Sequence, residues 1–343
     1  MNIKELAKIL NVSSSTVSRV LNEASGVSQE TRKMVLNGIK KYNYVPSSVA
    51  RNLSSNSTKN IAVIVPDIEN QFFSDLMSGV ASVAAKNNYN IFYLGTNELE
   101  SIEHKALDTM SSERLAGLII APVNSNDTVT LNKLTRLEKV NVPVVLVDRE
   151  FKAKSFSGVF VDNVSGAKEA TKCLIENGHD RIAIITGPEE SKPGSERLLG
   201  YLKAFKEKNL EIDSELIVSG DFKVRRAYQM TKELMSLKNK PTAIFCSNNL
   251  TSLGCIKYLT EKNIKIGEDV SIIGFDDLKT LEYIGFNFSA VYRDAKLQGE
   301  KAMELVIEKL KTKNNIVKKI NVPYKLILRG SEKFNFSKQK NKS

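Results

Sequence analysis

The chain has 343 residues, a net charge of +11 and no tryptophan. This length has room for a small N-terminal domain and two mid-sized domains. Apolar stretches are shorter than the ~20 residues that span a bilayer, and we expect neither a secretory signal nor a membrane association. Cys173, Cys246 and Cys255 are odd in number and lie in apolar contexts. We therefore expect buried, reduced thiols and a cytoplasmic protein.

The positive charge is concentrated near the N-terminus. Residues 1–58 contain eight basic and three acidic residues, a net charge of +5, and residues 331–343 carry +3, so the remaining 272 residues carry only +3. A small basic segment is what binding to phosphates requires. Residues 332–343 lack leucine heptads, so we expect a disordered basic tail and no coiled-coil tetramer.

Residues 1–46 show the pattern of three short helices. Asn2, Ser13 and Ser28 are predicted N-caps, each followed by apolar residues at helical spacing. The predicted inward-facing side chains are Ile3, Leu6, Ala7, Leu10, Val17, Val20, Leu21, Val35, Leu36, Ile39 and Tyr42. The short turn at residues 11–12 predicts a helix-turn-helix, although each amphipathic helix alone also fits an ordinary helical subdomain.

The outer face of the second helix carries small hydroxyls and one arginine. We expect Ser14, Ser15 and Arg19 to face DNA base edges in the major groove, because hydroxyls serve several bases and arginine prefers guanine. Neighbouring polar residues are better placed for phosphate contacts or caps. These are Ser13, Thr16, Ser18, Asn22, Ser28 and Thr31.

Residues 47–58 predict a hinge helix and a linker. The segment 46–53 is long enough for two helical turns, which are unstable without support. The following Ser/Asn-rich residues 54–58 indicate a linker.

From Ile61 onward, apolar runs alternate with amphipathic helices, which predicts α/β layers. Strands are expected at residues 61–65, 90–94, 115–121, 142–147, 159–161, 181–186, 242–246 and 270–274. Helices are expected, for example, at 73–86, 164–177 and 250–262. Two such series in tandem predict two doubly wound parallel-sheet subdomains, 59–161 with 292–320 and 162–291 with 321–331. A helix near 295–311 and a last strand at 324–329 cross back between them.

Polar and aromatic residues follow the predicted strands. Ligands of open α/β sheets bind beyond the carboxyl ends of the strands. Carboxylates and amides there pair with hydroxyls, and rings pack on an apolar sugar face, so the mixture suits a polyhydroxyl ligand. The expected cleft residues are Asn70, Phe72, Phe73, Asp148, Arg149, Arg197, Asn248 and Asp276. Structural alternatives are that Asp148 caps a turn, that Phe72 or Phe73 belongs to the core, and that Asn249 caps a helix.

Three motifs together resemble the lactose-repressor/galactose-repressor (LacI/GalR) family of bacterial transcription regulators. They are Thr-Val-Ser-Arg-Val-Leu-Asn at 16–22, Val-Ser-Gln-Glu-Thr-Arg at 27–32 and Tyr-Val-Pro at 44–46. The resemblance covers residues 1–331 and implies a periplasmic-binding-protein-like core. It also implies a hinge helix that folds on operator DNA, with Ala50 and Leu53 as contacts and Leu53 wedged into the minor groove. The alternative is that Leu53 packs against the core.

The resemblance supports a ligand-binding role for the expected cleft residues, and one position departs from the family pattern. The family segment after Gly-Phe-Asp-Asp (residues 274–277) ends in a glutamine, whereas Arg293 stands at that position here. An arginine would favour an anionic ligand, such as a sugar phosphate or sugar acid, or it would pair with Asp148 or Asp294. Arg293 is therefore an additional candidate effector residue, and both interpretations stay open.

The predicted function is that of a homodimeric repressor of sugar uptake or catabolism genes. It would bind a pseudo-palindromic operator in double-stranded DNA. A sugar or sugar phosphate would either release it from the operator or make its binding to the operator tighter. The alternative is a catabolite-control-type regulator whose DNA binding is set by a phosphoprotein partner. A periplasmic sugar-binding protein would lack the DNA-binding segment. With two histidines in no catalytic or metal-ligand arrangement, we expect no enzyme, metal or cofactor.

Overall fold

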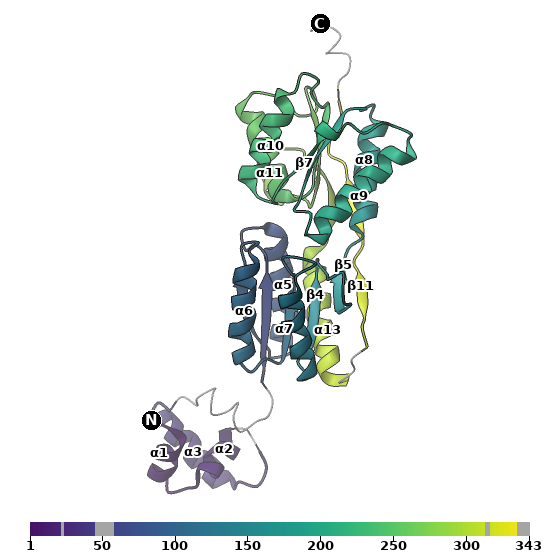
Figure 1. Ribbon diagram of the computed structural model, residues 1–343. Helices are drawn as coiled ribbons and strands as arrows, with labels where there is room; N and C mark the ends of the chain where they lie inside the picture. Colours follow the sequence, from purple (N-terminus) through teal and green to yellow (C-terminus); the bar gives the residue numbers. More distant parts are fainter. Residues whose placement is uncertain (22–23, 45–57, 313–315, 335–343) are drawn as a thin grey trace. The chain divides into compact units, whose positions relative to one another are not determined.

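The computed structural model describes residues 1–21, 24–44, 58–312 and 316–334 (Figure 1). The chain divides into two compact units, Met1–Thr58 and Lys59–Ser343. The predicted hinge helix and the DNA-contacting positions Asn22, Ala50 and Leu53 lie outside the described residues.

The N-terminal unit contains three helices, α1 (Ile3–Ile9), α2 (Ser14–Leu21) and α3 (Gln29–Lys41). The predicted caps are confirmed. Asn2 and Glu5 form a reciprocal capping box, with the Glu5 amide donating to Asn2 Oδ1 at 3.0 Å. Ser28 Oγ accepts the Thr31 amide at 3.2 Å. The core of this unit consists of Leu6, Ala7, Val17, Val20, Val35 and Tyr44.

Two predicted core positions of α3 are wrong. Leu36 is 45% exposed and Tyr42 is 39% exposed. The buried stripe that starts at Val35 continues three residues later at Gly38, so Leu36 lies off the stripe. A Cβ on Gly38 would come within 2.6 Å of Leu10 Cδ1, which shows how closely α3 packs on the end of α1. Tyr42 is already the C-cap residue of α3.

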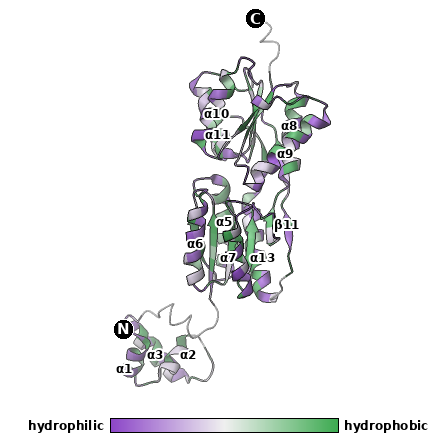
Figure 2. Cartoon of the chain, in the orientation of Figure 1, coloured by the Kyte–Doolittle hydropathy of each residue, from purple (hydrophilic) through white to green (hydrophobic). Residues whose placement is uncertain are grey.

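The first sheet of the larger unit has six parallel strands in the order β11-β5-β4-β3-β1-β2. Its strands are β1 (Asn60–Val65), β2 (Asn90–Gly95), β3 (Gly117–Ile120), β4 (Val144–Val147), β5 (Ser157–Phe160) and β11 (Lys319–Asn321). Its helices are α5 (Gln71–Lys86), α6 (Glu100–Ser112), α7 (Thr128–Lys139) and α13 (Ala295–Thr312). The central strands are apolar and buried, and the hydrophilic residues lie on outer helix faces (Figure 2).

The second sheet has the order β12-β10-β9-β8-β6-β7, and only its edge strand β12 is antiparallel. Its strands are β6 (Ile182–Thr186), β7 (Ile217–Ser219), β8 (Ala243–Cys246), β9 (Ser271–Phe275), β10 (Ser289–Arg293) and β12 (Tyr324–Ile327). Its helices are α8 (Asn163–Glu176), α9 (Lys192–Glu207), η1 (Ser214–Leu216), α10 (Val224–Ser236), α11 (Asn249–Glu261) and α12 (Lys279–Tyr283). The structure thus has the two doubly wound subdomains that the alternation predicted.

The chain crosses between the two sheets after β5, β10 and β11. The predicted subdomain boundaries at 291/292 and 320/321 fall inside β10 and β11, so the last two crossings lie one or two residues further along. The first residues of the expected disordered tail, 332–334, are placed against the second subdomain, and the rest of that prediction lies outside the described residues. Glu332 is 3% exposed, and Phe334 packs edge-on against His179 with ring centroids 5.1 Å apart.

Two glycines let α5 and α13 approach backbone to backbone. A Cβ on Gly79 would lie 2.0 Å from the Lys296 carbonyl oxygen, and a Cβ on Gly299 would lie 2.0 Å from the Leu76 carbonyl oxygen. Side chains at these positions would therefore push the helices apart. The contact fixes α13, the helix that follows the second crossing, on the first subdomain.

The three cysteines are free; Cys246 and Cys255 are buried as expected, whereas Cys173 is only half-buried. None of the helices in the described part of the chain combines the length and the apolar character that a bilayer span requires.

Candidate functional site

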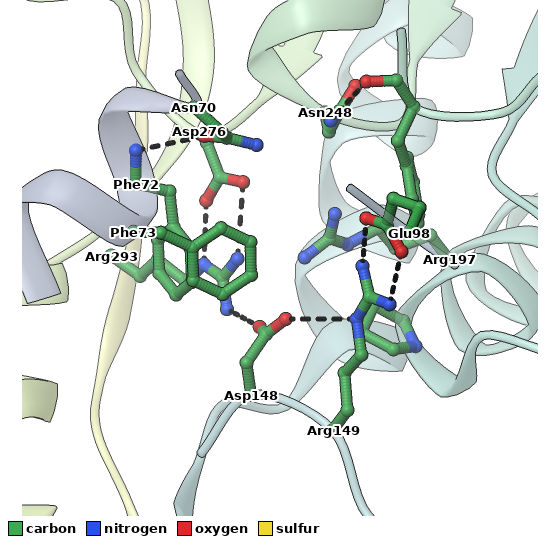
Figure 3. Close-up of a pocket in the computed structure, with 12 residues that line it drawn as sticks. Asn70, Phe72, Phe73, Glu98, Asp148, Arg149, Arg197, Asn248, Asp276 and Arg293 are labelled. Atoms are coloured by element: carbon green, nitrogen blue, oxygen red, sulfur yellow. Dashed lines mark hydrogen bonds and ion pairs between the residues drawn. The ribbon is translucent and has the colours of Figure 1, made fainter. Parts of the chain in front are cut away.

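A pocket lies between the subdomains at the carboxyl ends of the two sheets (Figure 3). All nine cleft residues expected from the sequence line it, together with Glu98, Pro193 and Phe222, which the sequence reasoning missed. Glu98 follows the end of β2, so the rule that ligands bind at strand ends would have indicated it. Phe222 follows β7, a short strand that was not predicted. The free volume between these side chains is about 20 Å³, room for about one water molecule.

Asp148 and Asp276 occupy equivalent positions in the two subdomains. Each directly follows a central strand, β4 or β9, and each has a positive φ, +63° and +69°. The Asp148 amide donates to the Val159 carbonyl at 3.1 Å, and the Asp276 amide donates to the Val291 carbonyl at 2.9 Å. Aspartate tolerates this left-handed conformation better than most residues. Both carboxylates are thereby directed into the pocket from opposite subdomains.

Arg293, at the end of β10, joins these carboxylates. Its Nε donates to Asp276 Oδ1 at 2.6 Å, its Nη2 to Asp276 Oδ2 at 3.2 Å, and its Nη1 to Asp148 Oδ1. Its guanidinium also lies 3.7 Å from the centre of the Phe72 ring. Of the two interpretations of Arg293, pairing with Asp148 is present in the structure. Asp294 is not its partner, because Asp294 Oδ1 accepts the Leu297 amide instead.

The arginines keep Asp148 ionised. Burial alone would raise the pKa of Asp148, but the positive charges of Arg293, Arg197 and Arg149 lower it below its usual value. Arg149 is itself held by Glu98 through two hydrogen bonds, of 2.7 and 2.6 Å. The pocket is therefore lined by ionised groups that are mostly paired with one another.

Arg197 is the exception. It is 2% exposed, its Nε donates to Asn163 Oδ1 at 3.0 Å, and its Nη1 donates to the Ser247 carbonyl at 2.6 Å. Its Nη2 has no hydrogen-bond acceptor among the described residues. Burial lowers the pKa of Arg197 to about 10, so the side chain remains charged at neutral pH. A buried, charged N–H group without an acceptor is a donor for a ligand oxygen.

The asparagines of the pocket also begin helices. Asn70 Oδ1 accepts the Phe72 amide at 2.9 Å at the start of α5, and Asn248 Oδ1 accepts the Thr251 amide at 2.8 Å at the start of α11. The alternative that Asn249 is the cap is wrong, since Asn248 holds that position. Asn249 instead donates to Asn70 Oδ1 at 2.8 Å, across the two subdomains.

Phe72 and Phe73 serve the pocket and the core together. Both line the pocket, and both belong to the buried apolar cluster of the first subdomain. Their rings meet edge to face with centroids 5.0 Å apart. The two interpretations of these residues are therefore compatible.

Further polar contacts join the subdomains around the pocket. Lys223 Nζ lies 2.6 Å from Asp67 Oδ2, and Lys192 pairs with Glu150. Ser125 Oγ donates to the Glu190 carbonyl at 2.9 Å. Together with the bond from Arg293 to Asp148, these contacts hold the cleft closed.

A buried carboxyl group, Glu103 on α6, lies behind the Arg149 side of the pocket. It accepts hydrogen bonds from Thr130 Oγ1 at 2.8 Å and from the Val123 amide at 2.9 Å. The Val123 carbonyl accepts from Arg149 at 3.3 Å. Burial raises the pKa of Glu103 from 4.5 to about 7.

Replacing Glu103 by glutamine should flatten the pH dependence of stability. Between pH 4.5 and 7 the folded state keeps a proton that the unfolded state loses, so the free energy of unfolding falls as the pH rises. The full effect is about 3 kcal/mol. Thermal unfolding of wild type and Glu103→Gln across this range measures it, with the exposed Glu113→Gln as control. Parallel pH profiles for all three proteins would contradict the assignment.

One group of metal-ligand residue types lies outside the pocket. Side-chain ligand atoms of Glu100, His104 and Asp127 lie within 4.8 Å of one another. His104 Nε2 and Asp127 Oδ2 are 2.5 Å apart, and Asp127 Oδ1 accepts the Val129 amide at the start of α7. These hydrogen bonds account for the arrangement.

The N-terminal unit presents its predicted DNA-contacting side chains on and next to α2. Ser14, Ser15 and Arg19 are exposed. Ser13 Oγ lies within hydrogen-bond distance of Ser15 Oγ and Thr16 Oγ1, at 2.7 and 2.8 Å. The remaining predicted positions are Ser18 and Thr31, which are half-buried, and Ser28, which is exposed. Several of these hydroxyls thus also order the helix starts.

Comparison with known protein families matches both units. Residues 2–47 match the model described as bacterial regulatory proteins, lacI family. Residues 58–329 match the model described as periplasmic binding proteins and sugar binding domain of LacI family.

Individual relatives align with nearly the whole chain. The HTH-type transcriptional repressor PurR of Actinobacillus pleuropneumoniae serotype 3 (strain JL03) is 34% identical over 311 residues, 90% of this chain and 91% of the relative. PurR of Histophilus somni (strain 2336) is 32% identical over 332 residues, 96% and 98% of the two chains. A crystal structure of the Lac repressor dimer bound to operator and the anti-inducer ONPF superimposes with a TM-score of 0.84 at 23% identity, covering 97% and 99%. This last likeness shows the fold.

The two family matches and the identity to PurR over nearly the whole of both chains indicate the same family. The chain therefore belongs to the lacI family of bacterial regulatory proteins, as a DNA-binding transcriptional repressor with a ligand-binding domain.

Proposed function

We propose that this repressor binds a pseudo-palindromic operator as a homodimer, and that a small polar effector, a sugar or sugar phosphate, binds in the cleft and changes operator affinity. The observation that carries the proposal is the convergence of nine polar, charged and aromatic side chains from both subdomains on one pocket. A ligand that contacts both walls binds one arrangement of the subdomains better than another, which is the requirement for an effector.

The pocket chemistry supports a ligand rich in oxygen atoms. Arg197 Nη2 offers a free charged donor, and the rings of Phe72, Phe73 and Phe222 offer apolar faces. Solved structural neighbours include a CelR–cellobiose complex, at 24% identity and a TM-score of 0.73. They also include a LacI family regulator from Enterococcus faecium with bound ribose, at 24% identity and a TM-score of 0.70.

The coupling to DNA would run through the closed cleft. An effector larger than one water has to replace part of the contacts that join the subdomains, such as Lys223 to Asp67. We propose that the resulting shift alters the support for a hinge helix at residues 47–58, in which Ala50 and Leu53 contact the minor groove. Operator DNA must then change effector affinity by the same factor.

Control by a phosphoprotein partner is not favoured. Relatives with at least 30% identity include the PurR repressors of Histophilus somni and Actinobacillus pleuropneumoniae. The transcription regulator CcpA of Lactococcus lactis is 24% identical with a TM-score of 0.72, a likeness that shows the fold alone.

Changing Arg19 to alanine should weaken specific operator binding by about 10- to 100-fold, which is the usual effect of losing a bidentate arginine–guanine contact. Fluorescence anisotropy with the operator and with unrelated DNA measures the loss of specificity. Lys40→Ala, an exposed basic residue on α3, is the charge control and should change the specificity ratio less than about threefold. Equal losses in both variants would mean that Arg19 binds phosphate rather than a base.

The test of the proposed function is binding of the purified protein to DNA upstream of its own and neighbouring genes, with and without a panel of sugars and sugar phosphates. Release or tightening by one compound supports effector control and gives its sign. Specific binding that no compound alters favours the protein-partner alternative. Absence of specific binding to any of these fragments would refute the operator proposal.

A further inference from the structure

Arg293 fills the part of the pocket between the two subdomains. Its side chain is buried, with 5% of the residue exposed, and its guanidinium bonds to carboxylates from both walls. Phe72, from the first subdomain, packs against the face of the same guanidinium at 3.7 Å. These are the kinds of contact, hydrogen bonds and ring stacking, with which a protein binds a small planar molecule.

The two carboxylates depend on this cation. Asp148 and Asp276 are buried on opposite walls, and two buried carboxylates that share a site repel each other without a positive charge between them. Arg149 is paired with Glu98, and Arg197 is hydrogen-bonded to Asn163 and Ser247. Arg293, by contrast, bonds to both carboxylates at once, Asp148 on the first wall and Asp276 on the second.

The free volume supports the same conclusion. Only about 20 Å³ remains in the pocket while Arg293 is in place, which holds about one water molecule. The pocket is thus largely filled by a side chain of the protein itself.

We propose that Arg293 is a built-in ligand of this cleft. Its guanidinium occupies the place between Asp148 and Asp276, and it holds the two subdomains closed before any effector binds. The role of this contact in regulation rests on the proposed function. The effector has to bind on the Arg149 and Arg197 side of the pocket, where hydrogen-bond donors face it. It also has to act on a cleft that Arg293 already holds closed.

Chemical rescue tests this inference. Arg293→Ala should open the cleft. Small-angle X-ray scattering should then give a larger radius of gyration for the protein, and its melting temperature should fall. Methylguanidinium at millimolar concentration should restore both values towards wild type, because it replaces the missing group between the two carboxylates. Wild type should not respond.

Lys223→Ala is the matched control. It removes another ion pair between the subdomains, with Asp67, from a lysine that does not line the pocket. This variant should not respond to methylguanidinium. If Arg293→Ala does not fold, the double variant Arg293→Ala/Asp148→Asn removes one of the two carboxylate charges and with it their repulsion, and it should be folded, open and insensitive to methylguanidinium.

A wild-type radius of gyration in Arg293→Ala or in the double variant would overturn the inference. Rescue of Lys223→Ala by methylguanidinium would overturn it as well, since the additive would then act elsewhere. The scattering experiment contains neither DNA nor effector, so it fails or succeeds independently of the operator-binding test.

Discussion

Arg197→Ala is expected to suppress the effector response, with effector binding weakened by about 10- to 100-fold. The variant removes a buried charged donor, and a hydrogen bond to a charged group contributes about 1.5–3 kcal/mol. It also leaves the Ser247 carbonyl and the Asn163 side chain without their partner. Isothermal titration with the compound found in the operator screen measures the loss. Operator binding without effector should stay within about threefold of wild type.

Two further variants show whether the guanidinium itself matters. Arg197→Lys keeps the charge but lacks the second Nη group, so it should retain part of the affinity. Arg225→Ala, an exposed arginine on α10, should bind effector as wild type does. Unchanged effector affinity in a folded Arg197→Ala protein would remove Arg197 from the proposed site.

Gly79→Ala is expected to destabilise the core by about 3 kcal/mol, the upper end of the usual effect of overpacking. The added methyl group would lie 2.0 Å from the Lys296 carbonyl oxygen, a backbone atom that moves only with α13. Alanine favours helix more than glycine does, by about 1 kcal/mol, so any destabilisation comes from the clash. Urea unfolding followed by circular dichroism measures the change in midpoint.

Ser78→Ala provides the control for Gly79→Ala, because Ser78 is exposed one position earlier in the same helix. It should change stability by less than about 0.5 kcal/mol. A stabilised Gly79→Ala protein would mean that α5 and α13 separate easily, which would contradict the close packing of these helices.

Much of the core was predictable because its signals are local. The buried parallel strands are short apolar runs, such as the one that starts at Ile61, and the helices that cover them are periodic. Three strands were missed: β7 and β11 have three residues each and are partly exposed, and β10 is mostly buried but mixes polar and apolar residues instead of forming an apolar run. The prediction for Leu36 failed because it neighbours the buried Val35 and adjacent residues on a helix do not share a face, and the prediction for Tyr42 failed because the helix ends there.

The amino-acid sequence was enough to predict the family, the alternation of strands and helices, and nine residues that line one pocket, several of them at strand ends. It could do so because strand ends of a parallel sheet share one edge, so position along the chain predicts position in space. The partners within that pocket, by contrast, follow from the three-dimensional packing alone. Arg293 bonds to Asp148, 145 residues away, and to Asp276 rather than to the adjacent Asp294. Such pairings depend on how two subdomains close on each other, and no local pattern encodes that geometry.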